Sequence, residues 1–524
     1  MRSTTCEMPQ RPRRSGVLLH PTSLPGPHGI GDIGPRARGF VDFLAEAGQA
    51  VWQVLPLAPT GYGDSPYQTL SAFAGNPLLV SLEDLRDEGW LSEDDLAGAP
   101  PFPPSEVDYP RVASWKGALL RRAGERFRAR ALVGEKEAFA AFRAQEAAWL
   151  EDLALFLTLK EGHGGVAWTR WDPPLARRDA RALASARRER AAEIDGHAFA
   201  QWVFDRQWGR LRDHARARGV ALMGDLPIYL AHDSAEVWAR PKLFLLDAEG
   251  RPLAVAGVPP DYFSATGQLW GNPLHDWAAQ AAEGYSFWVE RMRKNLRLYD
   301  LVLLDHFRGF EAYWEVPAGA TTAQAGRWAR GPGAAVFDAM QGALGPLPIV
   351  AENLGVITPE VEALRRRFGF PGMAILQFAF GKDPQADSFK PHNYTRDMVA
   401  YTGTHDNDTV EGWWASREGA GSIRTAGDIE EERAHAKAYL ATDGREMSWV
   451  LLRAVYASVA ELAMAPLQDL LGLGSEARMN TPATASGNWR WRFQESALSP
   501  ALARRARELA LLYGRALGPV SSNQ

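Results

Sequence analysis

The sequence has one cysteine, no long apolar run and little excess of charge of either sign. The single thiol, Cys6, excludes an intrachain disulfide and is typical of reducing compartments. No run of about 18 apolar residues is present to span a membrane, and the basic start MRSTTCEMPQRPRR lacks the apolar core of a signal peptide. With 58 Lys and Arg against 63 Asp and Glu, the charge gives no reason to expect a nucleic acid or membrane partner. We therefore expect a cytoplasmic protein.

Several site motifs are also missing. The chain has no P-loop, no H-E-x-x-H, no paired C-x-x-C and no G-x-S-x-G. His405 and Asp406 are neighbours, but no third metal ligand stands at a suitable spacing. The stretch GIGDIG, residues 29–34, matches G-x-G-x-x-G, yet it begins well after the apolar run that ends at His20, whereas a dinucleotide site needs its first glycine at the strand end. We therefore expect no metal and no cofactor.

Aromatic residues, by contrast, are frequent. The chain contains 19 Trp and 13 Tyr among 524 residues. Most are expected to be packing residues, but several Trp stand in loop-like sequence, where a flat ring with a polar edge suits sugar rings or bases. These are Trp168, Trp171, Trp270, Trp413, Trp414, Trp489 and Trp491.

Eight short apolar runs recur along the chain, most of them separated by helical sequence. Their Val, Ile and Leu content without alternation is typical of strands covered on both faces, as in parallel sheets. Eight such strands predict an α/β fold, a (β/α)8 TIM barrel, with its chemistry at the carboxyl ends of the strands. A doubly wound open sheet remains the alternative, because periodicity does not report closure. The runs are 15–20, 50–57, 221–230, 301–307, 347–355, 374–380, 398–407 and 462–471.

The spacing of these runs predicts insertions. Long segments follow the second and third runs, and loops beyond about 12–15 residues are usually lids or binding loops. We expect a disordered tail at 1–14 and one catalytic barrel at 15–524. Insertion subdomains are expected at about 60–215 and about 235–290, the second of which contains the loop PPDYFSATGQLWGNP.

Four acidic residues stand at predicted strand ends. They are Asp225, Asp305, Glu352 and Asp406, at the third, fourth, fifth and seventh runs. One such residue alone is often a helix cap or a salt-bridge partner. Four on one rim repel one another, which destabilises the fold unless they have a function. Carboxylates converging in an aromatic cleft are the groups that cleave glycosidic bonds, one as acid and another as nucleophile.

A set of long motifs then identifies a family. The chain contains LLHPTSLPGP, GYGDSPYQ, GDLPIY, PPDYFS with WGNPL, DHFRGFEAYW, AENLGVITPEV, GTHDNDT and SEARMN with GNW. In order and over nearly the whole chain, these resemble the 4-α-glucanotransferases called amylomaltases or disproportionating enzymes, barrel enzymes related to the α-amylases. The resemblance implies transfer of α-1,4-glucan segments between maltooligosaccharides or starch chains, by a retaining mechanism without cofactor or metal.

The resemblance also implies roles for individual residues. Asp305 corresponds to the nucleophile and Glu352 to the general acid and base. Asp406 corresponds to the residue that holds the hydroxyls of the reacting sugar and favours its distorted ring.

Four further positions correspond to substrate-binding residues. His405 stands beside Asp406, and Asp225 contacts the same sugar. Tyr67 stacks near the bond that breaks, and Trp270, in a loop over the cleft, covers the glucan chain and excludes water.

The chain departs from the family pattern at two positions. The family has an Arg two residues before the nucleophile, where this chain has Leu303. A neighbouring guanidinium typically lowers the pKa of an aspartate by about 1–3 units, so we expect impaired transfer. A protein that binds glucan with little or no turnover, and an α-1,4-glucan hydrolase, remain as alternatives. The second departure is Asn353, where we expect Asp.

Overall fold

The central sheet is a barrel of eight parallel strands. In the computed structural model, which describes residues 12–260, 264–418, 424–484 and 486–518, the strand order is β10-β11-β12-β1-β2-β3-β6-β9. At the remaining seam the Ala351 N–H donates to the Pro371 carbonyl at 2.8 Å, which links β9 to the start of β10. The predicted (β/α)8 barrel is confirmed. Its strands are β1 (Arg14–Leu18), β2 (Val51–Gln53), β3 (Ala221–Leu226), β6 (Leu301–Leu304), β9 (Ile349–Ala351), β10 (Gly372–Ile375), β11 (Met398–Tyr401) and β12 (Leu462–Pro466).

Burial on both faces explains the unbroken apolar runs. Along β6, Leu303 points into the barrel, where it packs in one cluster with Val350. Val302 and Leu304 point the other way and belong to the larger core between the barrel and its helices. Successive side chains of a strand point to opposite faces. A strand that is buried in apolar surroundings on both faces therefore has no position that favours a polar side chain.

The strands are shorter than the apolar runs that predicted them. The run at 374–380 leaves the sheet after Ile375 and continues as a 3-10 turn. The run at 462–471 ends its strand at Pro466 and continues as helix α18 (Leu467–Leu471). Leu376 and Leu470 are nevertheless buried. An apolar run therefore indicates burial, and both a strand and a short helix can be buried.

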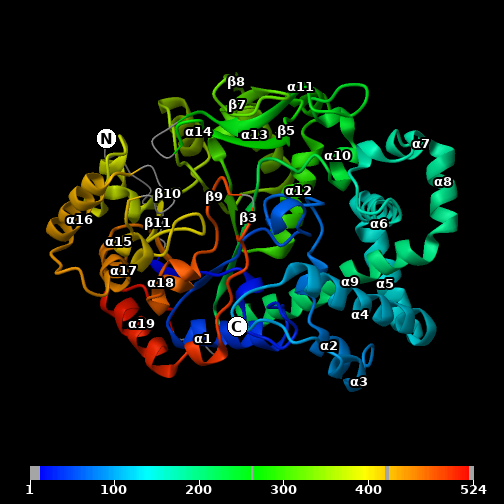
Figure 1. The fold of residues 1–524 in the computed structure, drawn as a ribbon, viewed down its shortest axis with the longest axis horizontal. Helices are drawn as coiled ribbons and strands as arrows, with labels where there is room; N and C mark the ends of the chain where they lie inside the picture. The colour runs from blue at the N-terminus through cyan, green and yellow to red at the C-terminus, as the bar shows by residue number, and fades with distance from the viewer. Residues whose placement is uncertain (1–11, 261–263, 419–423, 485, 519–524) are drawn as a thin grey trace, which may run out of the picture.

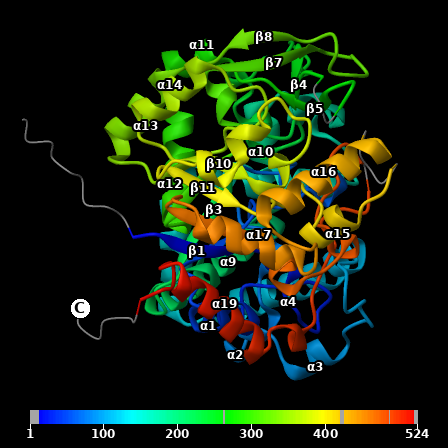
Figure 2. The same cartoon turned by 90° about the vertical axis from the view of Figure 1, so that its left-hand side faces the viewer.

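Helices cover the outside of the barrel. Figure 2 shows α1, α9, α12, α17 and α19 around the strands. In the parts of the chain that the structure covers, no helix is both long enough and apolar enough to cross a membrane. The covering helices are α1 (Pro35–Glu46), α9 (Ala191–Ala217), α12 (Ser286–Leu298), α13 (Ala334–Leu344), α14 (Pro359–Arg367), α15 (Val410–Ala415), α16 (Ala426–Leu440), α17 (Met447–Ala457) and α19 (Pro500–Leu512).

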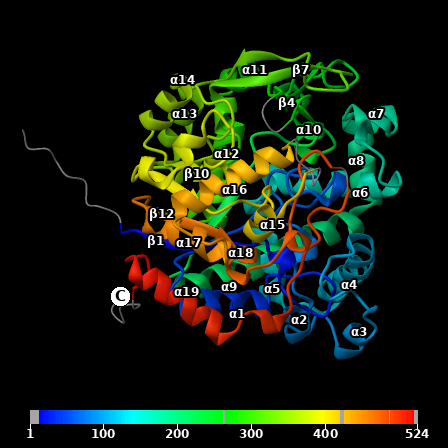
Figure 3. The same cartoon turned by 60° about the vertical axis from the view of Figure 1, so that its left-hand side comes forward.

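Two longer segments interrupt the alternation of strands and helices. Between β2 and β3 lies a group of helices on one flank of the barrel, visible in Figure 3. The helices of this segment before α9 are α2 (Leu82–Asp87), α3 (Glu93–Ala97), α4 (Tyr109–Arg130), α5 (Val133–Gln145), α6 (Ala147–Gly162), α7 (Pro173–Ala176) and α8 (Ala180–Glu189). Of the expected tail at 1–14, residues 1–11 lie outside the described residues, and Arg14 begins β1.

A second, antiparallel sheet lies above the barrel in Figure 1, with strand order β5-β4-β7-β8. Its strands come from the segment between β3 and β6 and from the connection after β6. They are β4 (Ala254–Val258), β5 (Gln268–Pro273), β7 (Ala312–Pro317) and β8 (Arg327–Arg330), accompanied by helices α10 (Ala235–Ala239) and α11 (Trp277–Ala282).

The glycines of GIGDIG pack against protein. A Cβ atom on Gly31 would lie 2.0 Å from the Pro21 carbonyl oxygen, and one on Gly34 would lie 2.2 Å from Ser81 Oγ. Both distances are far below van der Waals contact, so a side chain at either position would displace its neighbour. Close packing therefore accounts for these glycines without a bound phosphate.

Candidate active site

The ends of β3, β6 and β9 bring three carboxyl groups together. Asp225 is the penultimate residue of β3, and Asp305 and Glu352 directly follow β6 and β9. The Asp305 N–H donates to the Leu226 carbonyl at 3.1 Å, and the Glu352 N–H donates to the Leu304 carbonyl at 3.0 Å. The strand ladder thus continues into the two residues, which fixes both side chains at the carboxyl end of the barrel.

Asp305 and Glu352 are in direct contact. A hydrogen bond joins their carboxyl groups, and the backbone N–H of His306 also donates to Glu352 Oε2. His306 adopts a left-handed conformation, with φ of 49°, which is uncommon outside glycine, although Asn, Asp and His adopt it more often than other residues. This turn directs the amide toward Glu352.

The electrostatic environment of these groups opposes ionisation. Burial raises the pKa of Asp305 to about 6, and the charge of Asp406 acts in the same direction. Burial, followed by the charge of Asp305, raises the pKa of Glu352 and that of Asp225 well above their ordinary values. Among the described residues, no Lys or Arg is a main cause of a shift in any of the three.

Leu303 occupies the place beside this cluster where a cation is expected. It pairs with Asp225 across the β3–β6 ladder and with Val350 across the β6–β9 ladder. Its side chain is buried in the barrel interior, 5% exposed, among apolar neighbours such as Met223. Leu303 therefore supplies an apolar wall below the carboxyl groups and no charge.

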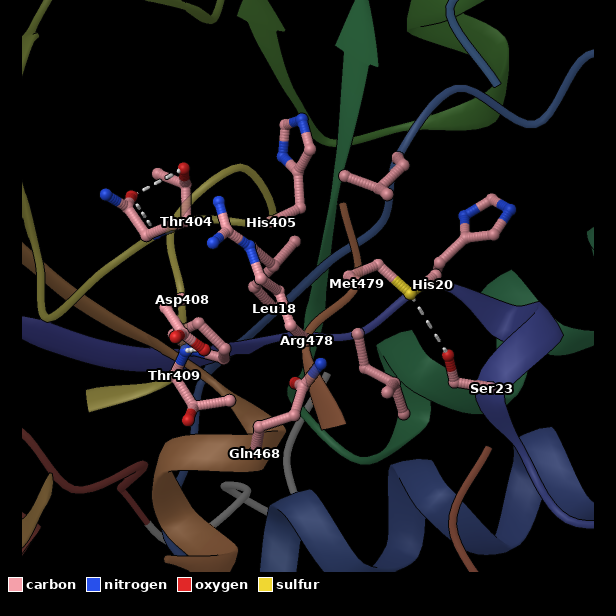
Figure 4. Close-up of a pocket in the computed structure, with 14 residues that line it drawn as sticks. Leu18, His20, Ser23, Thr404, His405, Asp408, Thr409, Gln468, Arg478 and Met479 are labelled. Carbon is pink, nitrogen blue, oxygen red and sulfur yellow. Dashed lines mark hydrogen bonds between the residues drawn. The ribbon is translucent and has the colours of Figure 1, made fainter. Parts of the chain in front are cut away.

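Asp406 lies across the cleft, in the loop that follows β11. Its side chain is half exposed, and Asn480 Nδ2 donates to its Oδ1 at 2.6 Å. The Arg478 guanidinium donates to the Asp406 carbonyl at 2.8 Å, and His405 Nε2 lies 3.3 Å from Asp406 Oδ1. Figure 4 shows Arg478 and His405 around a small hollow below this loop. Segment 478–480 thus holds Asp406 through both its backbone and its side chain.

Tyr67 connects the two sides of the cleft. Its hydroxyl donates to Asp225 Oδ2 at 2.7 Å. Its ring stacks on His405, with centroids 5.1 Å apart and an interplanar angle of 16°, and lies 5.9 Å from the ring of Trp489. Tyr67, His405 and Trp489 therefore form a continuous aromatic wall next to Asp225.

Trp270 lies on β5, close to the loop that follows β6 and contains Asp305 and His306. Its ring meets the His306 ring edge to face, with centroids 4.9 Å apart. The Gln68 side chain donates to the Trp270 carbonyl at 3.5 Å and to Asn272 Oδ1 at 3.1 Å. The structure therefore places Trp270 beside the residue that follows Asp305. Of the loop expected at 259–273, residues 261–263 lie outside the described residues, and Gln268–Pro273 form strand β5 instead.

All seven predicted site residues belong to this cleft. Three further residues in it were given no role from the sequence. Asn480 and Arg478, which hold Asp406, lie in the SEARMN motif, and Trp489 is one of the tryptophans in loop-like sequence. Their distance along the chain from Asp406 concealed their contacts. Within the described residues, no group of three or more His, Cys, Asp or Glu side chains is arranged to hold a metal ion.

Asn353 has a structural role at the barrel seam. Its Nδ2 donates to Glu362 Oε1 at 2.7 Å, and its Oδ1 accepts from the Met373 N–H at 2.8 Å. An Asp at this position would keep the second hydrogen bond, but it would replace the first by repulsion between two carboxylates. The amide therefore links the loop after β9 to both α14 and β10.

We expect Asn353→Asp to lower the free energy of unfolding by about 1–2 kcal/mol at pH 8, since it leaves a half-buried acceptor without its donor. The pKa of Glu362 lies below its ordinary value, so the cost should shrink only at strongly acidic pH, where Glu362 takes up a proton. Urea denaturation at the two pH values measures the difference. Equal stability of the variant and the parent at pH 8 would show that Arg365, which also pairs with Glu362 at 2.9 Å, offsets the repulsion.

Comparisons with known proteins agree with this geometry. A family description of 4-alpha-glucanotransferases matches residues 19–498. A 4-alpha-glucanotransferase from Thermus thermophilus is 53% identical over 95% of this chain and 98% of its own length. One from Synechocystis is 48% identical over 96% of this chain and 98% of its own.

Among solved structures, an amylomaltase from Streptococcus agalactiae in complex with acarbose superimposes with a TM-score of 0.91. It is 39% identical and covers 96% of this chain and 100% of its own. The barrel, the order of its motifs and the relatives lead to the same assignment. The chain belongs to the 4-alpha-glucanotransferase family.

Proposed function

We propose that this enzyme transfers α-1,4-glucan segments between maltooligosaccharides or starch-type chains by a retaining double displacement. The contact between the Asp305 and Glu352 carboxyl groups at the ends of β6 and β9 is the observation that carries the proposal. Inverting enzymes keep their two carboxyls about 6.5–9.5 Å apart to admit a water, whereas retaining enzymes hold them closer. Two carboxyl groups close enough to shift each other's pKa favour the shorter, retaining spacing.

In the first step, the Asp305 carboxylate attacks the anomeric carbon. The bond to the leaving sugar's O4 breaks while Glu352 donates its proton to that oxygen, so a covalent glycosyl-enzyme and a shortened chain result. The raised pKa of Glu352, caused first by burial, suits a group that must carry a proton near neutral pH.

In the second step, Glu352 takes the proton from the 4-hydroxyl of the acceptor chain. The acceptor oxygen then attacks the anomeric carbon and releases Asp305 as a carboxylate. Water in place of the acceptor would give hydrolysis, so the outcome depends on what occupies the cleft when the intermediate forms.

The remaining site residues hold the sugar that reacts. Asp406, fixed by Asn480 and Arg478, is placed to accept hydrogen bonds from its secondary hydroxyls. Asp225 offers a second hydrogen-bonding group, since its Oδ1 has no partner among the described residues. The rings of Tyr67 and His405 supply a stacked surface beside these carboxyls.

Incubation with maltotriose tests the function. We expect glucose and a ladder of longer oligosaccharides with little net gain of reducing ends. A large gain of reducing ends would show hydrolysis instead. Maltotriose binding without products would show a glucan-binding protein whose nucleophile is inactive.

Trp270→Ala should raise the ratio of hydrolysis to transfer severalfold. The ring lies over the catalytic loop at His306, and its loss should let water reach the glycosyl-enzyme while weakening the hold on the acceptor. The measurement is reducing-end release relative to chain redistribution from maltotriose. Trp168→Ala, in the insertion between β2 and β3, is the control and should leave the ratio unchanged. An unchanged ratio in Trp270→Ala would contradict the role of the ring.

We also infer the domain organisation and location. The two insertions, about 60–215 and about 235–290, are proposed to form subdomains on a single catalytic barrel at 15–524, which limited proteolysis of the insertion loops would test. A cytoplasmic location is proposed from the single cysteine, and cell fractionation would test it.

A further inference from the structure

An exposed tryptophan stands at the edge of the second sheet. Trp328, on β8, is 40% exposed, although indole rings are usually covered. It pairs across the ladder with Trp314, and the two rings meet edge to face with centroids 5.1 Å apart. Trp314 is anchored by a hydrogen bond from its Nε1 to the Ala323 carbonyl at 2.8 Å. Figure 1 shows β7 and β8 together above the barrel.

A buried arginine fixes one face of the Trp328 ring. The Arg308 guanidinium lies 3.6 Å from the ring centroid. Arg308 is only 4% exposed, and it donates through Nε to the Ala312 carbonyl at 3.2 Å and through a terminal nitrogen to the Val356 carbonyl. The cation is therefore immobilised, and the indole lies on a rigid support while 40% of the Trp328 surface remains exposed.

The position of this ring relates it to the reaction. Arg308 is three residues beyond Asp305, and Val356 is four residues beyond Glu352. The guanidinium thus links the loops that follow β6 and β9, and the Trp328 ring packs on this guanidinium. Asp406 and its aromatic neighbours come instead from the loop after β11, from the loop of Tyr67 and from the segment after α18 that carries Trp489.

The role of Glu352 indicates on which side of the cleft Trp328 lies, the donor side or the acceptor side. The group that protonates the departing oxygen lies toward the leaving chain, and the acceptor chain later occupies that same side. A surface continuous with the loop of Glu352 therefore meets the acceptor. Because the Trp328 ring packs on the guanidinium of Arg308 and not on the carboxyl pair itself, we assign it to sugars beyond the first acceptor position.

We propose that Trp328, with the exposed side chain of Val356, forms a distal acceptor subsite for an α-1,4-glucan chain. A pyranose ring has an apolar face of C–H groups, which packs on the electron-rich face of an indole. Val356, 47% exposed and attached to the same guanidinium, extends the apolar surface. The inference rests on the proposed function and adds a preference for long acceptors.

The test uses a fixed donor and acceptors of increasing length. α-Maltotriosyl fluoride serves as donor, because its leaving group leaves no sugar on the acceptor side. Transfer to glucose, maltose, maltotriose and maltoheptaose gives a KM for each acceptor. For Trp328→Ala we expect the KM for maltoheptaose to rise about three- to tenfold, the range of one aromatic contact, and the KM for glucose to change by less than about twofold.

Two further variants separate a subsite from a change in fold. Trp328→Phe keeps a ring on Arg308 and should retain most of the affinity for maltoheptaose. Trp449→Ala, on the outer helix α17, removes a matched ring that Arg505 covers at 4.0 Å, and it should leave every acceptor KM unchanged.

The outcomes are distinct. An equal rise in KM for glucose and maltoheptaose, or no rise for either, would overturn the inference while transfer itself remained. Absence of transfer in the parent enzyme with every acceptor would instead overturn the proposed function.

Discussion

Asp305→Asn should abolish transfer and at the same time make the protein more stable at pH 8. The amide cannot attack the anomeric carbon, so we expect kcat to fall by about four to six orders of magnitude, as for other removed nucleophiles. Single-turnover measurements with maltotriose would check the loss. Activity within tenfold of the parent would mean that Asp305 is not the nucleophile.

The stability gain follows from the raised pKa of Asp305. Its folded value of about 6 exceeds the value of about 3.9 expected in the unfolded chain. Above about pH 6 the folded protein must hold a charge that the unfolded chain carries more easily, so ionisation costs free energy of folding. As the pH falls from 6 to 4, this cost disappears. Asp305→Asn should therefore gain about 1–3 kcal/mol at pH 8 and little at pH 4.

A surface aspartate gives the opposite sign as a control. Hydrogen bonds from Lys382 and from Thr425, at the start of α16, lower the pKa of Asp428. Its charged form therefore stabilises the fold, and that contribution is lost as pH falls through the lowered pKa. Asp428→Asn should lower the melting temperature at pH 8 and leave transfer unchanged. A loss of stability in both variants would contradict the electrostatic account of the cleft.

Leu303→Arg should restore the ion pair that the family pattern contains. Residues two apart on a strand share a face, so the guanidinium would extend toward Asp305, and the register places it next to Asp225 as well. We expect the pKa of Asp305 to fall by about 1–3 units. The acid limb of kcat/KM should move to lower pH by the same amount.

The gain in activity depends on pH. With a pKa of about 6, roughly a tenth of Asp305 is ionised at pH 5, whereas a pKa near 4 would leave about nine tenths ionised. Transfer at pH 5 should therefore rise about tenfold, and at pH 8 ionisation alone should add little. Any larger gain at pH 8 would come from the way the guanidinium orients the carboxylate.

Leu303→Met is the matched control, because it lengthens the side chain in the barrel interior without adding charge. It should leave the acid limb where it is. If the arginine variant folds, as near-ultraviolet circular dichroism would show, and its acid limb does not move, the missing cation is not what limits ionisation of Asp305.

The barrel and its catalytic rim could be predicted from particular residues. The runs that contain Asp225, Asp305 and Glu352 begin as strands in the structure, and these residues lie at or just beyond the strand ends. The limits of the strands were wrong at 374–380 and 462–471, because apolar residues are buried equally well in a strand and in a short helix. The hydrogen bond from Asn480 to Asp406 was not predicted, because 74 residues separate the two along the chain.

The sequence by itself determined the fold class, the family and the absence of an arginine at position 303, because these depend on residue identity and order. Only the tertiary structure decided what that absence means for the cleft. Burial raises the pKa values of Asp305, Glu352 and Asp225, the charge of Asp406 adds to the shift of Asp305, and the charge of Asp305 adds to the other two. These effects depend on distances that no sequence pattern reports. The same holds for Trp328, whose exposed ring and supporting Arg308 come together only when two barrel loops meet.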